Sequence, residues 1–330
     1  MIDISKLPDD IQQAVRIESI FMPWATERRQ KFYEENRAFV HYTSADAALS
    51  IIRSKRLWMR NTNSMSDYRE VQHGFDIINK FFSDPSRKKT FGDAIESCFT
   101  GAAEEAITLF NQWWNDIRFN TYIASISEHD SDKEDLFGRL SMWRAFGGGN
   151  VARVGLVFRI PFYARSGLTL NLTLSPVAYH DERAAHAEIQ NVIDRITSEK
   201  AFLKSLDRTH FLDAVFNMLV AAVVCLKHQG FHEELEWRVI YAPNRTPSAL
   251  MQSELQTVAG VPQLIYKIPL DKTIDPTLAD IDLASMFSRL VIGPSPYPWV
   301  MYTAFVDALK NCGVLDAERR VVVSTIPIRG

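Results

Sequence analysis

The sequence predicts an α+β fold, with one sheet-containing domain over residues 39–329 and an N-terminal helical extension over 1–38. Short runs rich in β-branched and aromatic residues recur along the chain, and helix-like stretches separate them irregularly. No linker rich in Pro, Gly or Ser divides the chain, so we expect the helical stretch at about 182–228 to be an insertion in that domain. The hydrophobic content of 46% and charged content of 23% exclude a disordered or fibrous chain.

The first part of the chain predicts helices around two short strands. Residues 1–38 are polar, with apolar residues at helical spacing and no Gly. A compact strand–helix–strand unit follows, in which Ser44 or Asp46 caps a helix that runs through Ile51 and Ile52. The elements predicted here are strands at 38–43 and 57–60, an Asn- and Ser-dense loop at 61–70, and helices at 68–83 and 92–118.

The remainder of the chain contains most of the predicted strands. Residues 120–127 have the composition of a strand, and a charged turn is predicted at 128–134. A short helix at 140–146 ends at the glycine run 147–149. Further strands are predicted at 154–160, within 169–179, and at 236–241, 264–268, 289–292 and 320–326, with two long helices in 182–228, a polar loop at 243–256, and a loop and helix at 296–312.

Charge and cysteine content narrow the class of protein. The chain has 37 Lys and Arg against 40 Asp and Glu, a net charge of −3, which excludes a wholly basic surface for non-specific nucleic-acid binding. The chain has three cysteines, which are far apart and form no Cys-x-x-Cys pair. Such a pattern is typical of proteins in the reducing cytosol, which rarely form disulfides. The N-terminal segment lacks the features of a signal peptide, and the apolar stretch 211–226 is shorter than the roughly 20 residues that span a bilayer. We therefore expect a cytoplasmic protein that does not enter a membrane.

A strand that ends in His41-Tyr42-Thr43-Ser44 brings an imidazole and a phenol to one sheet edge. Such a pair can hold a ribose hydroxyl and stack on a ring. The alternative is a histidine that is bonded to backbone groups beside a half-buried tyrosine. The sequence leaves both interpretations open.

The segment Glu233-Glu234-Leu235-Glu236-Trp237-Arg238 carries paired carboxylates. If Glu236 begins a strand, the two-residue period of a strand points Glu234 and Glu236 to the same face. Such an arrangement suits acid–base chemistry or the stabilisation of a developing cation. The alternative is a solvated acidic turn in which Arg238 is an ion-pair partner.

Two serines and a tryptophan complete the set of candidates. Ser125 and Ser127 share one face of a predicted strand, and Trp143 is either part of a binding site or a core anchor. The glycine run after Trp143 is not a P-loop, because no Lys-Ser or Lys-Thr pair follows it. The sequence contains no HExxH, GxSxG, GxGxxG, Walker A or EF-hand pattern, and we predict no metal site.

Short motifs stand in a definite order along residues 39–329. They are His41-Tyr-Thr-Ser44 with its helix, residues 57–70, the strand ending Ser125-Ile-Ser127, Met142-Trp143, Gly155-Leu-Val-Phe158, Val177-Ala-Tyr179, Glu234-Leu-Glu236-Trp-Arg238, Leu290-Val-Ile-Gly293-Pro294 and Val323-Ser324. Together they resemble the bacterial family catalogued as domain of unknown function 2971. Membership of that family does not itself supply a function.

A second resemblance is to the ADP-ribosyltransferases, the fold of diphtheria-type toxins and of their relatives that modify RNA and DNA. Those enzymes place a His on the first strand, an aromatic residue or Ser on a middle strand, and a Glu near a late strand. The resemblance implies a split, mixed and mostly antiparallel central sheet in this chain. It also implies that NAD is the substrate.

The same resemblance implies a role for each candidate residue. His41 would bond the adenine-side ribose of NAD, and Glu236 would bind the nicotinamide ribose and stabilise an oxocarbenium-like transition state. Glu234 would orient the acceptor. Tyr42 or Trp143 would pack on the nicotinamide or adenine ring, and Ser125 and Ser127 would support the nicotinamide side. Arg60 and Arg238 would bind the pyrophosphate.

The resulting hypothesis is an NAD-dependent ADP-ribosyltransferase, a toxin or an anti-phage defence effector that modifies nucleic acid or protein. Such a protein would have a macromolecular acceptor and an antitoxin or defence partner protein. Two alternatives remain open. One is a non-catalytic sensor that binds a nucleotide or a partner protein in the same pocket. The other is a magnesium-dependent hydrolase or nuclease that uses Glu234, Glu236 and Asp67.

Overall fold

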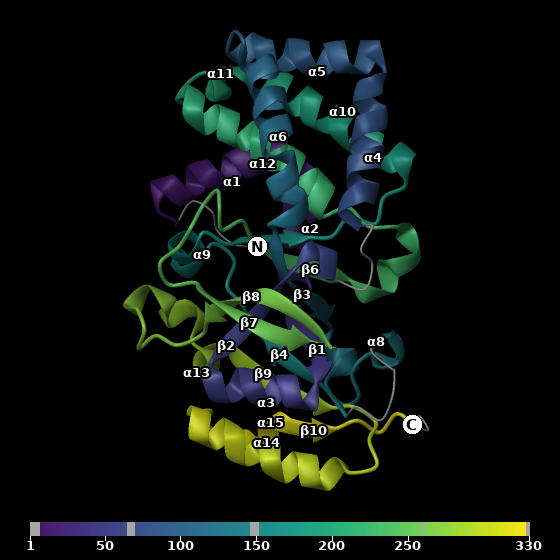
Figure 1. Ribbon diagram of the computed structural model, residues 1–330, viewed down its shortest axis with the longest axis vertical. Coiled ribbons are helices and arrows are strands. Elements are labelled where there is room, and N and C mark those ends of the chain that lie inside the picture. The colour runs from purple at the N-terminus through teal and green to yellow at the C-terminus, as the bar shows by residue number, and fades with distance from the viewer. Residues whose placement is uncertain (1–6, 65–69, 146–151, 259, 328–330) are drawn as a thin grey trace. The chain divides into compact units, whose positions relative to one another are not determined.

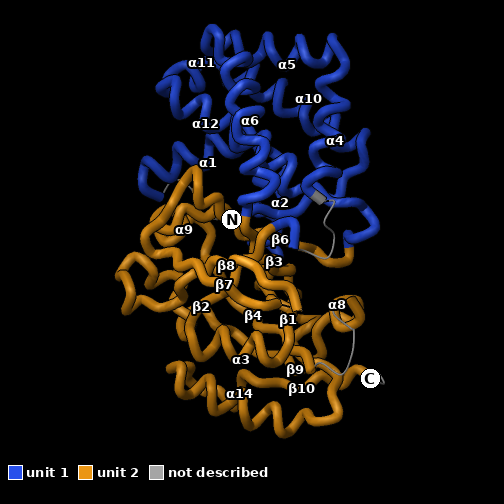
Figure 2. Tube along the Cα trace, viewed as in Figure 1, with its two compact units in different colours: residues 1–35, 62–121, 175–232 blue, residues 36–61, 122–174, 233–330 orange. Residues whose placement is uncertain are grey.

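The computed structural model describes residues 7–64, 70–145, 152–258 and 260–327 and shows an α+β protein (Figure 1). The chain forms two compact units, coloured separately in Figure 2. Unit 1 contains residues 1–35, 62–121 and 175–232, and unit 2 contains residues 36–61, 122–174 and 233–330. The stretch expected to be a helical insertion, 182–228, therefore belongs to the same unit as two earlier parts of the chain.

Unit 1 is helical. Several of its helices begin at aspartates that accept backbone hydrogen bonds, such as Asp84 from Ser86 and Arg87, and Asp181 from Ala184. No helix in the described part of the chain is both long and apolar enough to cross a membrane. The elements are α1 (Asp9–Phe21), α2 (Pro23–Glu34), η2 (Thr62–Ser64), α4 (Glu70–Ser83), α5 (Pro85–Cys98), α6 (Ala102–Phe119), α10 (Glu182–Ser198), α11 (Lys200–Leu203), α12 (Arg208–Val224) and η3 (Gln229–Glu234), the last of which ends in unit 2.

The helix predicted at 92–118 is in fact interrupted between α5 and α6. Gly101 adopts a φ of +76°, which favours glycine, and it is the N-cap of α6. The carboxylate of Glu96 accepts hydrogen bonds from the backbone N–H of Gly101 (2.7 Å) and of Ala103 (3.0 Å). The prediction was wrong here because helical spacing of apolar residues continues through the interruption.

Helices α4 and α12 come close together at Gly74. A Cβ atom at this position would lie 2.5 Å from the carbonyl oxygen of Val223 and 2.9 Å from its Cα. We expect Gly74→Ala to lower the free energy of unfolding by about 1–3 kcal/mol, because backbone atoms would have to move. Gly92 in α5 is the matched control, since a Cβ there meets nothing within 4 Å and Ala should stabilise the helix by about 0.5–1 kcal/mol. Urea unfolding compares the two variants, and equal effects would contradict this account of the α4–α12 contact.

Unit 2 contains the sheet except for the last two residues of β5, and the sheet has ten strands among the described residues. The strand order is β10-β9-β4-β1-β3-β2-β8-β7, while β6 pairs with β3 and β5 pairs with β6. Strands β9 and β10 are parallel, and the pairs along the rest of the order are antiparallel, so the sheet is mixed and mostly antiparallel as predicted. The strands are β1 (Ala38–Ser44), β2 (Arg56–Asn61), β3 (Tyr122–His129), β4 (Arg153–Phe158), β5 (Thr173–Pro176), β6 (Glu236–Tyr241), β7 (Gln252–Val258), β8 (Val261–Pro269), β9 (Phe287–Ile292) and β10 (Val321–Val323).

Short helices connect these strands, and one longer helix precedes the last of them. They are α3 (Ala45–Ser54), α7 (Ser131–Glu134), α8 (Leu140–Ala145), α9 (Arg165–Leu170), η4 (Pro276–Ile281), α13 (Leu283–Met286), α14 (Pro298–Cys312) and α15 (Ala317–Arg320). The Ser44 side chain caps α3 by accepting a hydrogen bond from the backbone N–H of Ala47. Of the two capping candidates, Ser44 and Asp46, the structure therefore shows Ser44 as the cap, with Asp46 in the first turn of the helix.

The sheet splits at β3. Along one edge, β3 pairs with β6 from Tyr122 to Ser127. Along the other edge, its pairing with β1 ends at Ser127, and its pairing with β2 ends at Ile123. Strands β1 and β2 therefore share one edge of β3 and separate on either side of Ser125.

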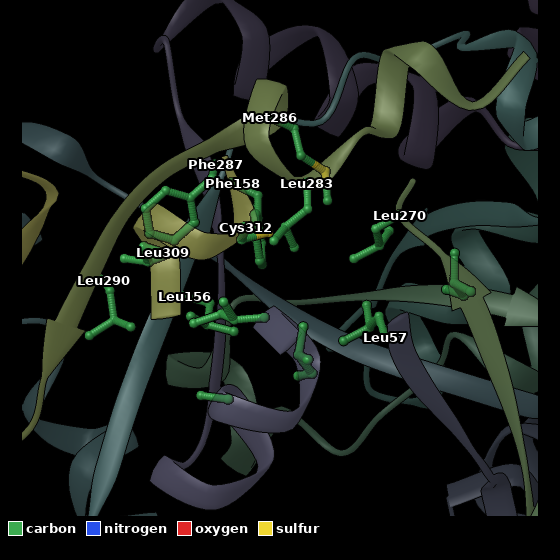
Figure 3. Packing of buried hydrophobic residues seen from close by; sticks show 14 of the residues in the cluster. Leu57, Leu156, Phe158, Leu270, Leu283, Met286, Phe287, Leu290, Leu309 and Cys312 are labelled. Carbon is green, nitrogen blue, oxygen red and sulfur yellow. The ribbon is translucent and has the colours of Figure 1, made fainter. Parts of the chain in front are cut away.

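The register gives the sheet two distinct faces. Leu57, Leu156 and Leu290 lie in the main core, with residues of α3, α13 and α14 (Figure 3). The opposite face is here called the site face. It is the face of the sheet to which the side chain of Val40 points. Val40 and Trp143 belong to a second, smaller cluster of buried residues. Burial of the core face leaves the site face for polar side chains.

Three further stretches differ from the prediction. The stretch 169–179, predicted as strand, begins inside helix α9, and β5 is limited to Thr173–Pro176. The polar loop predicted at 243–256 includes the start of edge strand β7, whose exposed side chains give it the composition of a loop. Glu128 and His129, predicted in a charged turn, are buried at the end of β3. Glu128 is stabilised there by a hydrogen bond from Trp237 Nε1 (2.8 Å).

Candidate active site at the split in the sheet

The pairing of β3 with β6, on the edge of β3 away from the split, brings four of the candidate side chains together on the site face. Ser125 lies opposite Arg238, and Ser127 lies opposite Glu236, in the antiparallel pairing of β3 with β6. Residues directly opposite each other share a face, and positions two apart on one strand do so as well. Because Val40 lies opposite Ser127, these residues share the face of the small cluster around Trp143.

Glu236 is the centre of this group. It is the first residue of β6 and is 5% exposed. Ser125 Oγ donates a hydrogen bond to Glu236 Oε1 (2.6 Å), and Arg238 donates from Nε to Oε1 (2.9 Å) and from Nη2 to Oε2 (3.1 Å). Both carboxylate oxygens are therefore fixed in position, and a buried negative charge is compensated by a buried guanidinium that is 1% exposed.

His41 lies one residue beyond the end of the β1–β3 pairing and opposite Leu156 of the core face, so its side chain leaves β1 on the other face from Glu236. Its Nδ1 is 2.9 Å from the carbonyl oxygen of Ser125. A carbonyl only accepts, so Nδ1 carries the proton and Nε2 of the neutral ring is an acceptor. Burial lowers the pKa of His41, and the hydrogen bond with Ser125 opposes this effect less strongly. Ser125 thus contacts His41 through its backbone and Glu236 through its side chain.

Tyr42 and Trp143 are buried against each other rather than exposed to a ligand. Their rings meet edge to face at a centroid distance of 4.9 Å, and they are 6% and 3% exposed. Trp143 Nε1 donates to the carbonyl of Phe137 (2.7 Å), and the Tyr42 hydroxyl accepts from the backbone N–H of Arg139 (2.9 Å). Burial, with a smaller effect of nearby Glu134, raises the pKa of Tyr42, so the phenol stays protonated. In this arrangement both aromatic residues support the site from within a core.

Arg60 and Ser127 lie where the two strands beside the split meet β3. Arg60 is on β2, and Ser127 of β3 pairs with Val40 of β1. Arg60 pairs with Ile123 where β2 meets β3, and its Nε donates to Gln263 Oε1 (3.1 Å). Arg60 is half-buried, and burial lowers the pKa of its guanidinium. Ser127 is buried between the positions of Val40 and Glu236 in the sheet. Gln263 is a site neighbour that sequence reasoning did not identify, since it stands on a distant strand.

Glu234 is not part of the strand that contains Glu236. It is the last residue of η3, and Leu235 has a φ of +45°, which interrupts the extended backbone between the two glutamates. The two-residue alternation used in the sequence analysis therefore does not reach Glu234. Its side chain is half-buried on the turn that leads into β6.

Arg139 fixes this turn and was missed by the sequence analysis. Its Nη1 donates to the carbonyls of Glu233 (3.1 Å) and Glu234 (3.2 Å), and its Nη2 donates to the carbonyl of Glu128 (2.6 Å). Its Nε also pairs with Glu134 Oε1 at 2.8 Å. A single guanidinium thus holds the backbone before Glu236 against the end of β3. No sequence motif marks Arg139, because its partners are mostly backbone carbonyls.

We expect Arg139→Ala to loosen the turn before Glu236. Hydrogen exchange of the backbone amides at 233–236 should accelerate about tenfold or more, because the hydrogen bonds that fix this backbone are lost. Arg159→Ala is the matched control, since Arg159 is exposed and bonds to the side chain of Asn36. Unchanged exchange in Arg139→Ala would show that the guanidinium does not position the turn.

The described residues do not provide a metal site. Among them, no three His, Cys, Asp or Glu side chains are grouped so that they could hold a metal ion. Asp67, which the hydrolase alternative requires, lies outside the described residues, as does the glycine run at 147–149. Glu236 itself is already engaged with Ser125 and Arg238.

Comparisons with known proteins give no relative for this chain. No family model matches it, and neither a curated protein nor a solved structure matches it. The two resemblances noted in the sequence therefore remain predictions. The function proposed below is supported by the geometry at the split in the sheet.

Proposed function

We propose that this protein transfers ADP-ribose from NAD to a macromolecular acceptor, with Glu236 as the catalytic carboxylate. The main support is the fixed position of Glu236 on β6, across β3 from the split, where Ser125 and Arg238 hold both of its oxygens. His41, with a neutral ring and an acceptor at Nε2, lies on β1, which pairs with the other edge of β3. A ribose hydroxyl can donate to that nitrogen.

The chemistry explains why a fixed carboxylate is useful. When the bond between ribose C1′ and the nicotinamide nitrogen breaks, the electron pair leaves with the nitrogen and positive charge develops on the ribose. A carboxylate that is already in place stabilises this charge more than it stabilises bound NAD. The acceptor then forms a bond to C1′ and loses a proton. In this proposal Glu234, on the turn before β6, orients the acceptor.

The remaining candidates have supporting roles in the proposal. Arg238 is buried on Glu236, so it holds the carboxylate, and Arg60 is the better placed cation for the pyrophosphate of NAD. Ser127 lies opposite Glu236 in the β3–β6 pairing, and Tyr42 and Trp143 fix the strand that carries His41. A toxin or defence effector would modify nucleic acid or protein, and an antitoxin or partner protein would control it.

Release of nicotinamide tests the proposal. The purified protein is incubated with NAD alone, and then with cell RNA, DNA or protein extract, and free nicotinamide is measured by chromatography. We expect time-dependent release that one class of acceptor accelerates. NAD binding without release under any condition would instead favour the sensor alternative, and the absence of both binding and release would contradict any role for NAD.

A further inference from the structure

Unit 1 contains an apolar pocket of about 120 Å³ that is lined only by residues of that unit. Its walls come from α1, α2, α4, α10 and α12 and from the segment 175–180, all drawn in blue in Figure 2. Phe21, Ile78, Val192 and Leu219 are typical wall residues, and each is almost fully buried. None of the residues assigned to NAD above lines this pocket.

One side of the pocket is polar. Trp24, His180 and Glu188 line it, and all three are half-buried. Glu188 Oε1 accepts a hydrogen bond from the backbone N–H of Trp24 (2.8 Å), and Glu188 Oε2 accepts a long one from Asn191 (3.4 Å). The rings of Trp24 and His180 meet edge to face at 5.2 Å. No Lys or Arg stands among the described residues that line the pocket, so an anionic group would find no cation there.

A polar groove of about 480 Å³ continues from this side, because Ile77 and His180 line both spaces. Burial lowers the pKa of His180, so its ring is neutral at pH 7 and does not repel a cation. Lys80 in the groove is paired with Glu182 at 2.8 Å. The charged residues that line the pocket and groove are Asp76, Asp181, Glu182 and Glu188 against Lys80.

We propose that this pocket binds a small amine with an apolar body. The apolar body fills the space between α1, α4, α10 and α12, and the ammonium group lies beside Glu188 and faces the acidic groove. The pocket of about 120 Å³ is slightly smaller than the apolar cavity of about 150 Å³ that binds benzene, so it suits a body of about one ring, with the ammonium outside in the groove. This site is independent of NAD chemistry, because it uses the other unit of the chain.

Isothermal titration calorimetry with three ligands of one ring size tests the proposal. The ligands are benzylamine, benzyl alcohol and benzoate, each titrated into the full chain. We expect benzylamine to bind with a dissociation constant of about 1 mM, which corresponds to about 4 kcal/mol. Benzoate should bind at least about tenfold more weakly, because no cation lines the pocket.

Two variants locate the binding. Glu188→Gln should weaken benzylamine about tenfold and leave benzyl alcohol unchanged, because only the ammonium uses the charge. Ala221→Leu should abolish binding of both, because the larger side chain fills the pocket that Ala221 lines. Circular dichroism and a melting curve show that each variant is folded. The proposal would be overturned if benzoate bound as tightly as benzylamine, or if benzylamine binding survived both variants. It would also be overturned if benzylamine did not bind to the wild type.

Discussion

Glu236→Gln should reduce the release of nicotinamide from NAD by about a hundredfold or more. The substitution keeps the size of the side chain and removes the charge that stabilises the developing cation, and removal of one such group costs about 10²–10³ in rate. Glu236→Asp should also be slow, because a shorter side chain moves the carboxylate away from the ribose. Initial rates at saturating NAD give the comparison.

Glu128 provides the matched control for Glu236. It is another buried glutamate, 2% exposed, on the strand that pairs with β6. Its carboxylate accepts from Trp237 Nε1 (2.8 Å), and its register position puts it on the opposite face from Ser127 and Glu236. Glu128→Gln should therefore keep the wild-type rate. Equal losses in both variants, or none in folded Glu236→Gln, would remove Glu236 from the mechanism.

Arg238→Met should lower the free energy of unfolding by about 3–5 kcal/mol. The substitution leaves the buried carboxylate of Glu236 without the guanidinium that binds both of its oxygens, and an uncompensated buried charge is costly. The double variant Glu236→Gln with Arg238→Met should recover about half of the loss or more, because it removes both charges. Arg159→Met, at an exposed arginine, should change stability by less than about 0.5 kcal/mol.

Urea unfolding measures these differences, and the double-variant cycle isolates the coupling between the two residues. A coupling close to zero would mean that the pair does not stabilise the site. Activity assays on the same variants add a second readout. If Arg238 positions Glu236, Arg238→Met should lose activity even under conditions in which it is fully folded.

Much of the fold could be predicted from the sequence because local patterns specify it. The strand at His41, a helix cap at Ser44 or Asp46 and the strand at Glu236 all follow from composition and periodicity over a few residues. The break between α5 and α6 could not be seen, because it depends on the backbone of Gly101 and a cap from Glu96. The edge strand β7 was missed because most of its side chains are exposed to solvent and its composition is polar.

The candidate site was only partly accessible from sequence. The pairing of Ser125 with Arg238 depends on the register of two strands that are far apart in the chain. The position of Glu234 depends on the positive φ of Leu235, and no residue pattern in the sequence predicts that backbone conformation. Arg139 acts mainly through backbone carbonyls, so its partners carry no sequence signal. Long-range pairing and backbone conformation, rather than residue type, decide these features.

Transfer of the adenine-labelled half of NAD to a macromolecule tests the central claim most directly. The wild-type protein, Glu236→Gln and Glu128→Gln are each incubated with adenine-labelled NAD and a cell extract, and label in the RNA, DNA and protein fractions is counted. We expect label in one fraction with the wild type and Glu128→Gln, and at least about a hundredfold less with Glu236→Gln. Label that appears equally with all three proteins, or in no fraction with any of them, would contradict this claim.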